Sequence, residues 1–91
     1  MSEVYDVAIR VISQKGTCDA GHKVGDEWLI KGKECKAPPG LCLFALSSLS
    51  PLVKVLMYGG VFPWDSDPDV TTCACLDADN PVVFELRRLQ K

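Results

Sequence analysis

The sequence predicts a small α+β domain in the order ββαββ, with antiparallel hairpins packed on a short kinked helical segment. Three observations indicate this class. Residues 4–12 alternate in hydropathy, residues 41–58 are mostly apolar, and two strand-like stretches near the C-terminus flank a turn-forming cluster. The 91 residues are 47% hydrophobic and 24% charged, which is typical of one globular domain, so we expect residues 1–91 to form a single domain.

The first part of the chain predicts two strands joined by a loop. Side chains one residue apart in a strand lie on opposite faces, and residues 4–12 follow that period. The predicted apolar face carries Tyr5, Val7, Ile9 and Val11, and the polar face carries Asp6 and Arg10. Residues 13–25 contain three glycines within ten residues, which favours a structured loop. Residues 27–31 then form a short second strand with Trp28 and Ile30 on one side.

The middle of the chain predicts helical structure. Residues 41–58 follow a proline-containing breaker and end at Gly59-Gly60, a C-cap signal. Serine is a good N-cap and proline suits the first helical position, so Ser50-Pro51 indicates either two short helices or one kinked helix. Apolar side chains surround the axis more fully than one small sheet can cover. We therefore expect part of this segment to lie in a subunit interface of a homo-oligomer.

The last third predicts a rigid loop followed by a hairpin. Residues 62–69 contain two prolines, two large aromatic residues and three aspartates. Residues 70–76 and 82–89 have strand character, and the cluster at residues 77–81 is typical of a turn. An antiparallel hairpin is the expected result.

Composition excludes several functional classes. The net charge of −2 and the lack of a basic run make nucleic acid an unsuitable partner. Polar residues interrupt the most apolar segment, so no membrane span is expected. The acidic start lacks the basic and apolar regions of a secretory signal, which favours a cytoplasmic protein whose cysteines are thiols.

Five cysteines are the main candidates for chemistry. They are Cys18, Cys35, Cys42, Cys73 and Cys75, with the spacing C-x16-C-x6-C-x30-C-x-C. Thiolates are the soft ligands of zinc and iron–sulfur clusters, and this number suffices for a four-thiolate site. The spacing lacks the paired C-x2-C motifs of zinc ribbons, and free cysteines also pack as small hydrophobic residues. Metal binding, packing and catalysis therefore stay open.

His22 is the single histidine of the chain. Together with Cys18 it suggests an activated nucleophile in an enzyme or small-molecule-binding protein, beside a pocket walled by Phe62 and Trp64. The alternative for His22 is that it holds its glycine-rich loop by hydrogen bonds to the backbone. A third possibility for the whole protein is an oligomeric scaffold whose thiols only pack.

Three blocks of the sequence resemble a known family. They are residues 18–27 (CDAGHKVGDE), Gly59-Gly60 followed by Pro63-Trp64, and residues 80–85 (NPVVFE). The chain resembles, over nearly its whole length, a family of uncharacterised small proteins of anaerobic bacteria and archaea. The family pattern places its cysteines at Cys18, Cys35, Cys42 and Cys75, which implies that Cys73 is the spare thiol. It often continues with Pro-Asp where this chain has Leu76-Asp77.

The resemblance raises metal binding above packing. Four thiols in anaerobic organisms imply an iron–sulfur cluster in preference to zinc, held by the four cysteines of the family pattern. The implied role is structural or electron-transferring, with a redox partner protein. The resemblance names no activity, so no catalytic residue is assigned.

Overall fold

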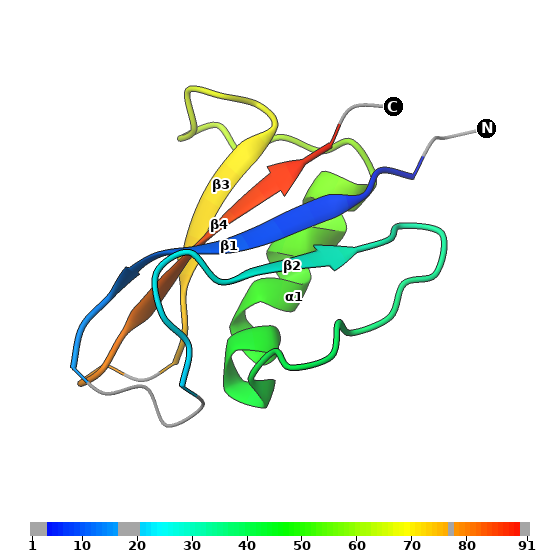
Figure 1. Ribbon diagram of the computed structural model, residues 1–91. Helices are drawn as coiled ribbons and strands as arrows, with labels where there is room; N and C mark the ends of the chain where they lie inside the picture. The colour runs from blue at the N-terminus through cyan, green and yellow to red at the C-terminus, as the bar shows by residue number, and fades with distance from the viewer. Residues whose placement is uncertain (1–3, 17–20, 77, 90–91) are drawn as a thin grey trace.

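The computed structural model describes residues 4–16, 21–76 and 78–89, which form a four-stranded antiparallel sheet and one helix (Figure 1). The elements in chain order are β1 (Val7–Gln14), β2 (Glu27–Ile30), α1 (Leu43–Met57), β3 (Val70–Ala74) and β4 (Val82–Arg88). The α+β class with antiparallel strands is therefore confirmed. No helix in these ranges has the length and apolar character needed to cross a membrane.

The strand order across the sheet is β2-β1-β4-β3, and every neighbouring pair is antiparallel. The predicted hairpin of β3 and β4 is confirmed, with Val70 opposite Arg87 and Ala74 opposite Val83. The N-terminal and C-terminal strands form the central pair, in register except for an irregularity between Val11 and Ser13. The two ends of the described chain are thereby tied together in the middle of the sheet.

Helix α1 packs against one face of the sheet (Figure 1). The buried core between the two layers consists of Val7, Ile9, Val11, Ile30, Ala45, Leu49, Val53, Leu56, Met57, Val82, Phe84 and Leu86. The inward face predicted for the first strand is confirmed at all three of its positions within β1, although β1 starts and ends later than residues 4–12. Burial of this one face sets the register, since a slip by one residue would expose it.

A single helix, α1, spans most of residues 41–58, where the sequence allowed either two short helices or one kinked helix. Pro51 lies inside α1 and is exposed. A proline inside a helix leaves the carbonyl four residues earlier without its usual donor. That carbonyl belongs to Ser47, which is also exposed, so water can supply the missing hydrogen bond. The helix therefore continues through the proline.

Arg88 at the end of β4 is buried, although the sequence assigned it no role. Its Nε donates to Asp69 Oδ1 at 2.9 Å, and its guanidinium lies over the Tyr5 ring, 5.4 Å from the centroid. The remaining hydrogen bonds go to backbone carbonyls of Leu56 (3.1 Å), Gly60 (2.8 Å) and Pro68 (2.7 Å). One side chain thus joins β4 to the end of α1 and to the loop before β3.

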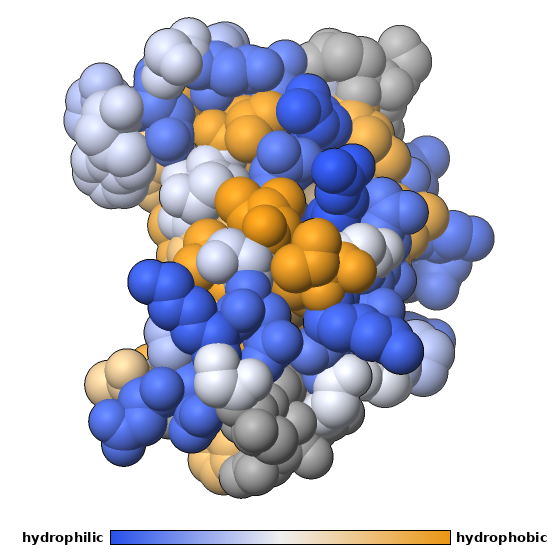
Figure 2. All heavy atoms as spheres, turned by 60° about the vertical axis from the view of Figure 1, so that its left-hand side comes forward, coloured by the Kyte–Doolittle hydropathy of each residue, from blue (hydrophilic) through white to orange (hydrophobic). Residues whose placement is uncertain are grey.

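Several large hydrophobic residues remain on the surface. They are Ile12, Val24, Leu29, Leu43, Phe44, Tyr58, Val61, Trp64 and Leu76. Figure 2 shows one side of the molecule, on which hydrophobic side chains gather in the middle and hydrophilic side chains surround them. Scattered exposed apolar residues are ordinary, so only contiguous groups indicate a binding surface.

Candidate functional site: a groove beside the helix

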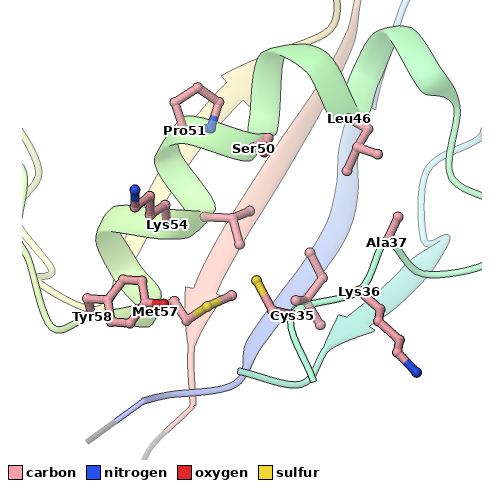
Figure 3. A pocket seen from close by; sticks show the side chains of 11 residues that line it. Cys35, Lys36, Ala37, Leu46, Ser50, Pro51, Lys54, Met57 and Tyr58 are labelled. Carbon is pink, nitrogen blue, oxygen red and sulfur yellow. The ribbon is translucent and has the colours of Figure 1, made fainter. Parts of the chain in front are cut away.

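A groove of about 630 Å³ runs between α1 and the segment that follows β2 (Figure 3). Its buried lining consists of Ile30, Val53 and Met57, which belong to the core. The helix also contributes Leu46 and Ser50, while residues 35–37 form the opposite wall. The groove therefore reaches the edge of the core along this side of α1, where Ile30, Val53 and Met57 keep only a small exposed fraction.

Cys35 occupies an unusual position in the wall of this groove. Its φ of 52° lies in the left-handed region, which costs a residue other than glycine about 1–2 kcal/mol. Its backbone N–H donates to the carbonyl of Lys31 at 2.9 Å, so the turn after β2 holds this conformation. The thiol points into the groove on the side of Met57 (Figure 3). Strained residues of this kind are concentrated at functional sites.

Two lysines stand at the edge of the groove. Lys36 comes from the loop wall and Lys54 from α1, and both are exposed. Figure 3 shows their side chains directed away from the buried lining. The buried part of the lining is thus apolar, Ser50 and the Cys35 thiol add polar atoms to the exposed part, and cationic groups on flexible stems border the opening.

The cysteines of the predicted metal set lie in different places. Cys35 faces the C-terminal half of α1, whereas Cys42 directly precedes its first turn. Cys75 follows β3 and accepts a hydrogen bond from the Val82 N–H at 3.3 Å. Cys18 lies outside the described residues. Within the described ranges, no three or more His, Cys, Asp or Glu residues are grouped so that they could hold a metal ion.

Cys73, the thiol that the resemblance leaves spare, lies on β3 with its sulfur 3.6 Å from the Ser48 carbonyl. It packs against the core, as do Cys42 and Cys75. Cys35, Cys42, Cys73 and Cys75 are all free thiols. Packing is therefore a sufficient role for the three cysteines that contact the core. It does not explain Cys35, which is exposed.

His22 is buried and links its loop to the start of the helix. Its Nε2 accepts a hydrogen bond from the Cys42 backbone N–H at 3.0 Å. The ring lies edge-on to Trp28 at 4.8 Å and to Phe84 at 6.3 Å between centroids. This is a backbone hydrogen bond of the kind that the loop-holding interpretation predicts.

Replacing His22 by phenylalanine is expected to lower the free energy of unfolding by about 1–3 kcal/mol, because the Cys42 N–H would lose its acceptor. Chemical denaturation followed by circular dichroism measures this loss. The matched control is Val24→Phe at an exposed position of the same loop, which should change stability little. Equal stability of His22→Phe and the wild type would contradict the structural role.

Phe62 and Trp64 form a pair with ring centroids 5.0 Å apart. Their loop joins β4 at Arg88, whose N–H donates to the Asp69 carbonyl. His22 instead contacts Phe84, nearer the other end of β4. The predicted aromatic pair thus exists, and both ends of its loop are held at Arg88, whereas His22 packs on Trp28 and Phe84.

Comparisons of the chain with protein-family models, with curated proteins and with solved structures find no match. The family resemblance stays a prediction. The groove itself has one signal in the sequence, which is that Leu46, Val53 and Met57 follow helical spacing along one side of the predicted helix. That spacing does not show which loop stands opposite, so the groove could not be predicted from it.

Proposed function

We propose that this protein binds a small, largely apolar molecule in the groove between α1 and residues 35–37. The observation that carries the proposal is the apolar lining, open to solvent, with the Cys35 thiol directed into it. Its volume of about 630 Å³ is within the roughly 300–1,000 Å³ typical of small-molecule sites. The proposal keeps the small-molecule alternative predicted from the sequence and assigns it to different residues.

The lining indicates the kind of ligand. An apolar body would cover Ile30, Val53 and Met57, and the polarisable sulfur of Cys35 would contact it at the opposite wall. An anionic group on such a molecule would lie at the opening, where Lys36 and Lys54 can turn toward it. We therefore propose an apolar carboxylate or a similar monoanion as the ligand class. We also propose a cytoplasmic location, since reducing conditions preserve free thiols.

Filling the groove is expected to abolish binding. Ala37 lines the groove and is exposed, so Ala37→Phe should obstruct it without disturbing the core. We expect the affinity for the apolar anion 1-anilinonaphthalene-8-sulfonate, measured by fluorescence titration, to fall at least about tenfold, or roughly 1.4 kcal/mol. Thr72→Phe, exposed on β3, is the control and should bind the dye like the wild type. Equal binding by both variants would refute the groove as the site.

The second candidate is the iron–sulfur centre implied by the resemblance. One observation favours it: Cys42 and Cys75 are partly buried near the same half of α1, where Ser48 Oγ donates to the Ala74 carbonyl at 3.0 Å. Such a centre would have a structural or electron-transfer role and would use a redox partner protein. Zinc at the same thiols is the alternative metal.

Anaerobic purification tests the metal centre. A cluster predicts brown protein that contains iron and acid-labile sulfide. Cys42→Ser and Cys75→Ser should lose the metal, while the matched variant Cys73→Ser should keep it. Colourless, folded and metal-free protein would exclude this candidate, and equal metal loss in all three variants would contradict the assignment of Cys73 as spare.

A further inference from the structure

Asp6, the residue directly before β1, lies in a segment that backbone hydrogen bonds hold in place. The Tyr5 N–H donates to the carbonyl of Met57, at the end of α1, at 2.8 Å. The Leu89 N–H donates to the Asp6 carbonyl at 2.9 Å. The carboxylate Oδ1 of Asp6 accepts a hydrogen bond from the Gly32 N–H at 2.9 Å. The segment around Asp6 therefore joins the end of α1 to the turn that follows β2.

The hydrogen bond between Asp6 and Gly32 acts on Cys35 through one peptide unit. The Gly32 N–H and the Lys31 carbonyl belong to the same planar peptide, so fixing one of them fixes the direction of the other. The Lys31 carbonyl accepts the Cys35 N–H at 2.9 Å and the Glu34 N–H at 3.1 Å. Asp6 thus orients the acceptor that holds Cys35 at its φ of 52°.

Gly32 also fits closely against the N-terminal segment. It is buried, and a Cβ atom at this position would lie 2.5 Å from the Tyr5 carbonyl oxygen and 2.5 Å from a methyl group of Val4. Unbonded heavy atoms prefer a separation of about 3.5–4.0 Å, so a side chain here would push the turn away. The turn is therefore held against residues 4–6 by packing as well as by the hydrogen bond.

We propose that Asp6 is a positioning residue of the ligand groove, because it holds the Cys35 wall in place opposite Met57. The inference rests on the ligand groove proposed above and adds a residue from outside its lining. Residues 5 and 6 bond to the backbone at the end of α1 and in the turn that leads to the opposite wall. Walls that are fixed before the ligand arrives lose less conformational entropy on binding. Asp6 therefore raises the affinity without touching the ligand.

Dye titration and amide hydrogen exchange, followed by NMR on the same variants, test this role. Leucine is similar in size to aspartate but accepts no hydrogen bond, so Asp6→Leu leaves the buried Gly32 N–H without its acceptor. We expect the affinity for 1-anilinonaphthalene-8-sulfonate to fall at least about fivefold, and exchange of the Cys35 amide to become faster by a similar factor. Asp6→Asn keeps the Oδ1 acceptor and should retain both wild-type values.

Val11→Ala is the matched control for a loss of stability alone, since Val11 is buried in the core and lies outside the groove lining. It should bind the dye like the wild type. Unchanged dye affinity or unchanged Cys35 exchange in Asp6→Leu would overturn the role of Asp6, and so would an equal loss of affinity in Val11→Ala. A wild type that does not bind the dye would instead refute the ligand groove itself.

Gly32→Ala tests the same turn with Asp6 intact, and it decides the question if Asp6→Leu fails to fold. Its Cβ would displace the turn from the Tyr5 carbonyl, so dye affinity and protection of the Cys35 amide should fall as in Asp6→Leu. Lys33→Ala, at an exposed position of the same turn, should change neither. Wild-type affinity and exchange in Gly32→Ala would contradict the positioning of the wall by this contact.

Discussion

Replacement of Arg88 by methionine is expected to lower the free energy of unfolding by about 3 kcal/mol, a large part of the roughly 5–15 kcal/mol that stabilises a typical domain. The side chain is 7% exposed, so its hydrogen bonds are made away from water. Removing the guanidinium deprives the Leu56, Gly60 and Pro68 carbonyls of a donor. Asp69 is about one-third exposed, and water can compensate there.

Urea denaturation of Arg88→Met, Arg88→Lys and Arg87→Met measures this effect. Lysine keeps the charge but cannot reproduce the planar fork of donors, so Arg88→Lys should be clearly destabilised as well. Arg87 is exposed on the opposite face of β4, and Arg87→Met should change stability by less than about 0.5 kcal/mol. Similar losses for the Arg87 and Arg88 variants would show that the buried network contributes little.

Leu56→Glu is expected to unfold the protein. Leu56 is 0% exposed and lies in the core between α1 and the sheet. An unpaired carboxylate at this position loses its hydration without gaining a partner, and the leucine contacts are lost as well. Circular dichroism and proton NMR should show loss of the folded state. The control, Leu43→Glu on the exposed face of the same helix, should stay folded.

This comparison separates the core side of α1 from its outer side. Apolar side chains surround most of the helix axis in residues 43–57, so the sequence leaves Leu56 equally suited to a core and to an interface. A folded, monomeric Leu56→Glu variant would place it in an interface and would contradict its burial within one chain. A folded Leu43→Glu variant together with an unfolded Leu56→Glu variant is the result that the structure predicts.

The candidate site was predictable only in part. The cysteine pattern made Cys35 one of five candidates for chemistry and left packing open, and the structure places its thiol at a groove that the sequence did not predict (Figure 3). The partners of that thiol come from α1, at least ten residues further along the chain. Local spacing cannot indicate which helix face a loop will meet. Local spacing does not show either which thiols lie close together in the fold. Cys35 and Cys42 are close in sequence, but they lie beside different halves of the helix.

The sequence by itself determined the elements whose patterns are local. Alternation specified the inward face of β1, and the turn cluster at residues 77–81 specified the hairpin of β3 and β4. The mostly apolar segment between a proline-containing breaker and Gly59-Gly60 specified the helix. Tertiary structure alone decided the central pairing of β1 with β4 and the burial of Arg88. Both depend on contacts between residues distant in the chain, whose stability comes from jointly burying apolar surface and satisfying polar groups. The hydropathy pattern within one segment cannot predict such contacts.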